Sequence, residues 1–134
     1  MKRRVLFLVS LALLSTPALA HHGGGSYWAD RTVGPVSGTA TAFSFNFPHV
    51  SFSLDVPDAQ GILVNHRMTI RWTPTVLRRM GWTRRSIEPG DKLTVTYVPH
   101  KQDSTVGSPL SLEVNDVSMN IETPEDANAE YQVQ

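Results

Sequence analysis

Residues 64–81 read VNHRMTIRWTPTVLRRMG, and this stretch decides the fold because it changes from strand to helix within a few residues. Side chains that are apolar or fit an apolar face occupy every second position over residues 64–72, which predicts a strand with one buried face. A short helix is predicted next, since Thr73 is a favoured N-cap, Pro74 suits the first helical position and Gly81 is a stop signal.

Alternating segments also lie on both sides of this stretch. Residues 36–45 and 50–56 predict two strands before it, and residues 93–97 and 110–121 predict two after it. The last segment changes phase near Asn115-Asp116, which predicts a β-bulge. This order predicts a mainly β protein, a five-stranded OB-like small barrel with one short helix between strands 3 and 4. A small open sheet or an SH3-like barrel is the alternative.

The first twenty residues have the features of a secretory signal peptide. Three basic residues at positions 2–4 precede an apolar run of about ten residues, which is too short to span a bilayer. Ala18-Leu19-Ala20 then places small side chains where a signal peptidase reads the chain. We therefore expect residues 1–20 to be removed, the mature chain to begin at His21, and the protein to be periplasmic or secreted.

Composition limits what the mature chain can do. It holds nine basic and twelve acidic residues, a net charge of −3, which does not indicate nucleic acid as a partner. The absence of cysteine excludes disulfides, thiolate metal sites and cysteine catalysis. No second long apolar segment follows, so no membrane partner is expected after signal removal. We expect a flexible N-terminal arm over 21–35, attached through Tyr27-Trp28, a barrel domain over 36–121 and a disordered acidic tail over 122–134.

Histidines provide the leading candidates for a metal site. The amine and imidazole of His21 can chelate Cu(II) or Zn(II) together, with His22 beside them. His49 lies in the loop between strands 1 and 2 and His100 in the loop between strands 4 and 5, two loops that border the binding face of OB barrels. The alternative is that all four are surface histidines without a ligand. His66 falls on the apolar face of strand 3, where a half-buried core histidine is expected.

The remaining polar residues indicate binding and not catalysis. Arg67 and Arg71 share the polar face of strand 3 and predict a small-anion surface, with an ordinary solvated face as the alternative. No nucleophile elbow, phosphate loop or paired-histidine protease motif occurs, so no enzyme is expected. A third hypothesis is an enzyme based on a histidine brace. The sequence therefore predicts a periplasmic, non-enzymatic module that binds Cu(II) or Zn(II). The alternative is a metal-free domain for an unknown protein or small-molecule partner, using the strand 2–3 face.

Several short motifs resemble a family of small exported bacterial proteins known only as a domain of unknown function. The resemblance spans most of the mature chain and implies an OB-like fold without an established activity. In the family pattern Asn directly precedes Pro-His, whereas Phe47 stands in that place here. The N-terminus itself is similar to the histidine braces of periplasmic copper proteins. The motifs are His21-His22-Gly23, Asn46 to His49, Trp72, Leu77-Arg78-Arg79-Met80-Gly81-Trp82 and Glu88-Pro89-Gly90-Asp91.

Overall fold

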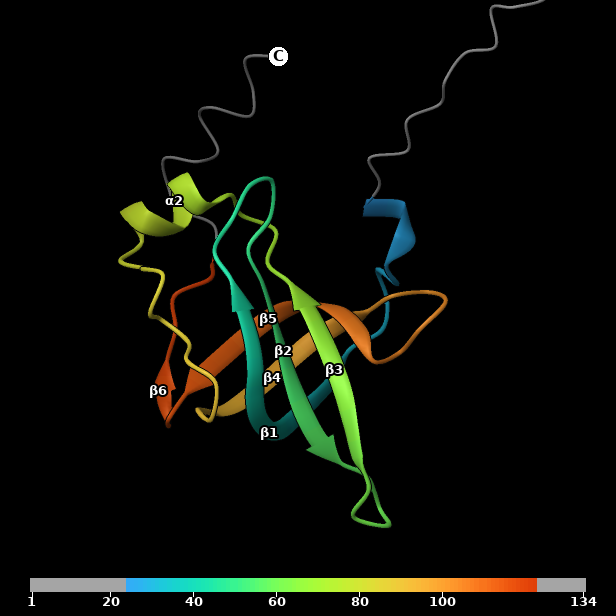
Figure 1. The fold of residues 1–134 in the computed structure, drawn as a ribbon. Coiled ribbons are helices and arrows are strands. Elements are labelled where there is room, and N and C mark those ends of the chain that lie inside the picture. The colour runs from blue at the N-terminus through green and yellow to red at the C-terminus, as the bar shows by residue number, and fades with distance from the viewer. Residues whose placement is uncertain (1–23, 123–134) are drawn as a thin grey trace, which may run out of the picture.

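The computed structural model describes residues 24–122, which form a small β-barrel with one short α-helix (Figure 1). The elements follow in the order η1 (Gly24–Ser26), β1 (Val33–Ser44), β2 (Ser51–Pro57), β3 (Leu63–Thr69), α2 (Pro74–Arg79), β4 (Lys92–Pro99), β5 (Val106–Val114) and β6 (Val117–Ser118). Within residues 24–122, no helix is long and apolar enough to cross a membrane.

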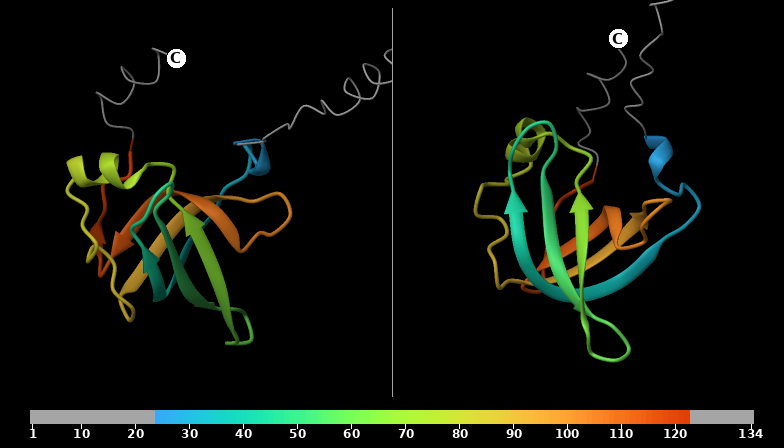
Figure 2. Two further views of the ribbon diagram at one scale, coloured as in Figure 1. Left: turned by 45° about the horizontal axis from the view of Figure 1, so that its top comes forward. Right: turned by 45° about the vertical axis from the view of Figure 1, so that its right-hand side comes forward.

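Strand pairing closes the barrel. The strands are ordered β3-β2-β1-β4-β5-β6, and an additional parallel pairing of β3 with β5 joins the two sides. The long strand β1 curves around the barrel and pairs with β2 through one half and with β4 through the other (Figure 2). The prediction of a five-stranded OB-like barrel with its helix between strands 3 and 4 is confirmed, and β6 is a short addition to β5.

The alternating sequence patterns point their apolar side chains into the barrel. Tyr97 and Gly107 illustrate how closely the interior is packed, because a Cβ atom added at Gly107 would collide with the Tyr97 ring. The strand 3 pattern behaves as predicted, with Met68 and Ile70 buried and Arg67 exposed. The core is built from Ala40, Phe45, Val50, Phe52, Leu54, Met68, Ile70, Trp72, Leu77, Trp82, Ile87, Leu93, Val95, Tyr97, Leu112, Val114 and Ile121.

Helix α2 covers one end of the barrel. Thr73 caps it by accepting a hydrogen bond from the Val76 amide at 3.5 Å, and Pro74 occupies the first turn. The chain leaves the helix through Gly81, whose φ of 91° is a conformation that side chains with a Cβ rarely adopt. Leu77 is fully buried and anchors the helix on the core. These observations confirm the predicted cap and stop signals.

Several boundaries differ from those expected. Strand β5 begins at Val106 and not at residue 110, and β3 ends at Thr69 and not at Trp72. Asn115 and Asp116 have φ values of 51° and 66° and form the two-residue turn of a hairpin in which Val114 faces Val117. The predicted β-bulge was therefore wrong, because the alternation changes phase where the chain reverses direction. Strand β1 begins at Val33 and not near residue 36. A register shift at Gly34, whose φ is 114°, lets the strand continue past Pro35.

Candidate functional site

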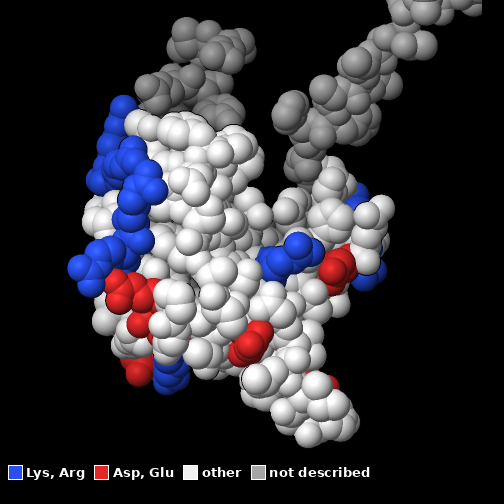
Figure 3. Space-filling view, viewed as in Figure 1, with Lys and Arg blue, Asp and Glu red and all other residues white. Residues whose placement is uncertain are grey.

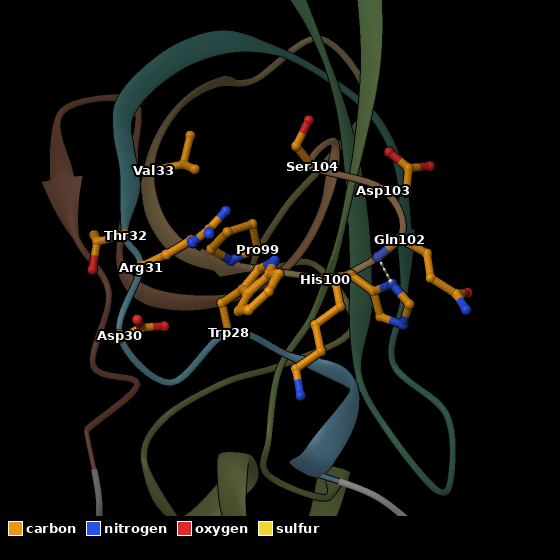
Figure 4. Close-up of a pocket in the computed structure, with 11 residues that line it drawn as sticks. Trp28, Asp30, Arg31, Thr32, Val33, Pro99, His100, Gln102, Asp103 and Ser104 are labelled. Carbon is orange, nitrogen blue, oxygen red and sulfur yellow. Dashed lines mark hydrogen bonds between the residues drawn. The ribbon is translucent and has the colours of Figure 1, made fainter.

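An open pocket lies between the segment before β1 and the loop that joins β4 to β5 (Figure 4). Its volume is about 600 Å³. We call it the arm–loop pocket, because residues 28–33 form one wall and residues 99–104 form the other. The two walls come from distant parts of the sequence, so the pocket depends on how the N-terminal arm is held.

Backbone hydrogen bonds hold the arm against the end of β4. The Trp28 amide donates to the Pro99 carbonyl at 3.0 Å, and the Lys101 amide donates to the Ser26 carbonyl at 2.9 Å. Between them, Tyr27 and His100 form an antiparallel bridge, with their rings edge to face at 5.4 Å between centroids. Residues 26–28 thus extend β4 by a short strand-like pairing. The expected attachment through Tyr27 and Trp28 is confirmed.

Two cations flank the indole of Trp28 in the pocket wall. The guanidinium carbon of Arg31 lies 4.0 Å from the ring centroid, and the Lys101 ammonium lies 5.6 Å from it. Both basic side chains are exposed while Trp28 is half-buried. Each contact of this kind is worth roughly 0.5–1 kcal/mol at an exposed site. The sequence analysis did not single out Arg31 or Lys101, because the arm and the loop are brought together only by the fold.

His100 is the pocket residue best suited to bind a metal. Its ring is half-buried, and its Nδ1 accepts a hydrogen bond from the Gln102 amide at 3.2 Å, drawn as the dashed line in Figure 4. In the neutral ring this bond leaves the proton on Nε2. A metal at Nδ1 would replace the Gln102 bond, and a metal at Nε2 requires the proton to move to Nδ1. Either mode breaks the Gln102 bond, which makes that amide a reporter of binding.

Asp103 adds a negative charge to the same loop. Its Oδ1 accepts hydrogen bonds from the Thr105 hydroxyl at 2.6 Å and from the Thr105 amide at 2.9 Å. These hydrogen bonds lower the pKa of Asp103, and the positive charges of Arg67 and His100 lower it further. Asp103 is therefore a carboxylate at neutral pH, and it favours a cation in the pocket.

The two arginines predicted to form an anion surface lie in different settings. Arg67 is in β3, and its backbone amide donates to the Thr105 carbonyl at 2.9 Å, so it borders the β4–β5 loop and its acidic Asp103. Arg71 lies beyond the last residue of β3, with its guanidinium carbon 4.9 Å from the centroid of the Trp72 ring. Both side chains are exposed, as predicted. Anion binding by the pair stays a prediction.

The loop histidines are not equivalent. His49 is exposed in the β1–β2 loop, whereas His100 lies against the arm. Figures 1 and 2 show the β1–β2 loop beside α2 and the β4–β5 loop at another side of the barrel. The expectation that these loops bring both histidines to one site therefore finds no support in their placement. Within residues 24–122, no contact of His49 supports the ligand role expected from the sequence.

His66 behaves as the predicted half-buried core histidine. Its Nδ1 lies 3.2 Å from the Tyr97 hydroxyl, which donates to the Ser104 carbonyl at 2.8 Å. Since that hydroxyl proton is used, the His66 Nδ1–H donates to the Tyr97 oxygen. Burial lowers the pKa of His66, although the nearby Asp103 charge acts in the opposite direction. His66 thus supports the β4–β5 loop from inside the barrel.

His21 and His22 lie outside the described residues, as do the proposed signal peptide and most of the predicted acidic tail. Within residues 24–122 the structure forms no cluster of three or more histidine, cysteine or acidic side chains that could hold a metal.

Comparison with known proteins identifies a family for this chain and no individual relative. Neither the curated proteins nor the solved structures gave a match to the chain. The model of one family, described as a family of unknown function (DUF6152), matches residues 8–109. That range includes the barrel through the start of β5, both walls of the arm–loop pocket and the motifs on which the resemblance was based. The chain belongs to this family of unknown function.

Proposed function

We propose that the protein is an exported, periplasmic metal-binding module without catalytic activity. Its mature N-terminus chelates Cu(II) or Zn(II) through the amine and imidazole of His21, and His100 supplies a further nitrogen ligand. The observation that carries the proposal is the pairing of Tyr27 with His100, which fixes the arm beside a half-buried imidazole. Nitrogen ligands of this kind suit both metals.

Chain length brings His21 within reach of the pocket. His21 precedes Gly24, the first described residue, by three positions, and three extended residues span about 10 Å. Residues 26–28 are bonded to residues 99–101, and this attachment supports His100, and not His49, as the partner of His21 in the proposed site. The tether raises the effective concentration of the N-terminal ligands at His100. His22 is the next nitrogen ligand along the chain and can complete the site.

One carboxylate in the pocket wall can act on a bound metal cation. Asp103 is held as a carboxylate by its hydrogen bonds to Thr105 and lies in the same loop as His100. Lys101 and Arg31 oppose this effect from the ring of Trp28, and with Asp30 and Asp103 they leave the pocket lining without a net formal charge. Asp103 can therefore act on a bound cation through its charge without being a ligand itself.

The decisive experiment uses protein processed at His21 in a periplasm. Cu(II) affinity measured by competition with a chromophoric chelator should fall at least tenfold when one residue is added before His21, because the amine then no longer shares a chelate ring with the imidazole. Affinity should also rise as the pH increases from about 5 to 8, since both ligands must lose a proton to bind and the ordinary pKa is about 7.7–8.0 for an N-terminal amine and about 6.5 for an imidazole. Equal affinities for the native and extended N-termini would refute the proposal.

A second measurement separates the two loop histidines. His100→Gln should weaken Cu(II) and Zn(II) binding, whereas the matched variant His49→Gln should leave both affinities within about twofold. Zn(II) is diamagnetic, so NMR can follow its binding directly. The Gln102 amide resonance should shift on Zn(II) addition, because either mode of His100 coordination breaks its 3.2 Å bond to the ring. An unmoved Gln102 resonance with Zn(II) bound would remove His100 from the site.

A metal-free interaction domain is the second candidate. It is favoured by the exposure of Arg67 and Arg71 on the β3 side of the barrel, where they can meet a small anion or an acidic protein surface. Replacing both with Gln should weaken salt-dependent binding of an anion such as inorganic phosphate and leave metal affinity unchanged. If wild-type protein binds no anion in a salt-dependent way, this candidate fails.

A further inference from the structure

Four arginines gather on the side of the barrel that carries α2. Arg78 and Arg79 are in the last turn of the helix, and Arg84 and Arg85 follow it in the next turns of the chain. All four side chains are exposed. Figure 3 shows a continuous band of basic side chains over this side. We call these four residues the arginine band.

Most of this positive charge is not neutralised by the described part of the chain. Arg85 pairs with Glu88, with 2.8 Å between Nε and Oε1. Within residues 24–122, Arg78, Arg79 and Arg84 make no ion pair, and Arg78 instead lies with its guanidinium carbon 5.4 Å from the Phe45 ring centroid. Guanidinium groups bind carboxylates in a bidentate manner, so the band is suited to an acidic peptide.

The described chain ends directly beside the band. The Trp82 indole nitrogen donates to the Asn120 carbonyl at 2.7 Å, and the Trp72 indole nitrogen donates to the Ile121 carbonyl at 3.2 Å. Ile121 is buried, so residues 120–121 are fixed in place. Figures 1 and 2 show this end of the chain next to α2. Trp82 itself lies between Arg79 and Arg84 in the sequence, which places the exit of the chain at the band.

The residues that follow carry the complementary charge. Glu125, Asp126 and Glu130 lie three, four and eight positions beyond Glu122. An extended chain reaches about 10 Å over three residues and about 27 Å over eight, whereas a six-residue helix such as α2 is about 9 Å long. Every carboxylate in this segment can therefore reach the band. A tether this short gives effective concentrations in the millimolar range, so weak individual ion pairs can still produce occupancy.

We propose that residues 123–134 dock on the arginine band through Glu125, Asp126 and Glu130. The band is then an internal docking surface for an acidic segment of the same chain. An external polyanion can occupy it only by displacing that segment.

Paramagnetic NMR tests this proposal directly. The chain has no cysteine, so Ala129→Cys provides one unique position for a nitroxide label in the mature protein. In about 20 mM salt the label should broaden the amide resonances of residues 78–85. In 1 M salt, where the screening length is about 3 Å, the broadening should fall to the level set by the tether alone. Broadening that does not change with salt would overturn the proposal.

Charge variants provide the matched controls. Glu125→Gln/Asp126→Asn/Glu130→Gln in the labelled chain should reduce the low-salt broadening to its high-salt level, and so should Arg78→Gln/Arg79→Gln. Arg31→Gln/Lys101→Gln removes the same number of exposed cations near Trp28 and should leave the broadening at α2 unchanged. Equal effects of the two double variants would show a dependence on net charge only and would refute docking at the band.

A competition experiment tests whether an external polyanion, and not residues 123–134, occupies the arginine band. A chain that ends at Glu122 should bind inorganic polyphosphate roughly three- to tenfold more tightly than the full mature chain, since it has no segment to displace. The gain should be absent when Arg78 and Arg79 are both replaced by Gln. If the full chain and the shortened chain bind polyphosphate equally well through the band, the band serves an external polyanion and residues 123–134 do not occupy it.

Discussion

The helix end and the arm end of this barrel are held by different forces. At the helix end, Trp82, Leu77 and Ile121 are buried, and the indole nitrogens of Trp72 and Trp82 bond to the backbone of the last described residues. At the arm end, contact depends on the two backbone hydrogen bonds of the Tyr27–His100 bridge and on a half-buried tryptophan beside two cations. The first is a hydrophobic cap on the core, and the second is a polar attachment at the surface.

This difference indicates which end is available for binding. Local opening is governed by the apolar area and the hydrogen bonds that must be disrupted, so the arm should detach at far lower free energy than the helix. Ligand sites are often found in such regions, where a rigid scaffold presents segments able to adjust. The candidate ligand His100 and the polar pocket lie at the weakly held end, which agrees with a division of the barrel into a stable side and a binding side.

The largest expected effect is at the helix end. Trp82→Ala should lower the free energy of unfolding by about 3–5 kcal/mol, because it removes a buried indole and leaves a cavity beside Phe43. Trp82→Phe keeps most of the apolar contact and loses the bond to Asn120, so it should cost less, about 1–2 kcal/mol. Urea denaturation followed by circular dichroism measures both. A loss below 1 kcal/mol for Trp82→Ala would contradict the view that this end carries the stability.

A second substitution tests the interior beneath the arm end. Gly107→Ala should destabilise the protein by about 1–3 kcal/mol, since the added Cβ collides with the Tyr97 ring and disturbs its bond to Ser104. Gly25→Ala is the control, because nothing lies within 4 Å of a Cβ at that position in the arm. Thermal unfolding should separate the two variants clearly. Similar melting temperatures would mean that the β4–β5 loop moves aside without cost.

Most of the barrel could be predicted because apolar and polar side chains alternate along each strand. The alternation from Val64 to Trp72 gave one correct face for strand β3, and the Thr73-Pro74 and Gly81 signals gave the ends of α2. The errors arose where the same sequence pattern is compatible with two different backbone structures. The alternation that begins at Val36 missed the part of β1 before the register shift, and the phase change at Asn115 fitted a bulge as well as a turn. Only positive φ values at both turn positions distinguish the two readings.

The candidate site was less predictable because it is assembled from distant segments. His100 could be chosen from the sequence as a loop histidine, but its pairing with Tyr27 could not. The positions of Arg31 and Lys101 at the site could not be predicted from the sequence, since only the docking of residues 26–28 on β4 brings both to Trp28. Backbone pairing between an arm and a strand end leaves little trace in residue type, because any residue can donate and accept through its main chain.

A smaller effect is expected at the arm end. Trp28→Ala should lower global stability by about 1 kcal/mol or less, because the side chain is half-buried at the surface. Its local effect should be larger: the Lys101 amide, bonded to Ser26, should exchange with deuterium markedly faster than in the wild type. Hydrogen exchange and urea denaturation of the same variant provide both numbers. If global stability falls as much as for Trp82→Ala, the two ends are one cooperative unit and the comparison fails.

The smallest effect concerns the pH dependence of stability under the pocket. Burial lowers the pKa of His66, so the folded protein favours the neutral ring, while the unfolded chain takes up a proton near the ordinary value of 6.5. As the pH falls through 6.5 toward the folded-state pKa, the unfolded state binds more protons and the protein loses stability. His66→Gln removes this contribution, so its urea midpoint should fall less than that of the wild type between pH 7.5 and 5. If the urea midpoints of wild type and His66→Gln change in parallel with pH, the imidazole is equally hydrated in the folded and unfolded states. The β4–β5 loop would then not cover His66 in solution.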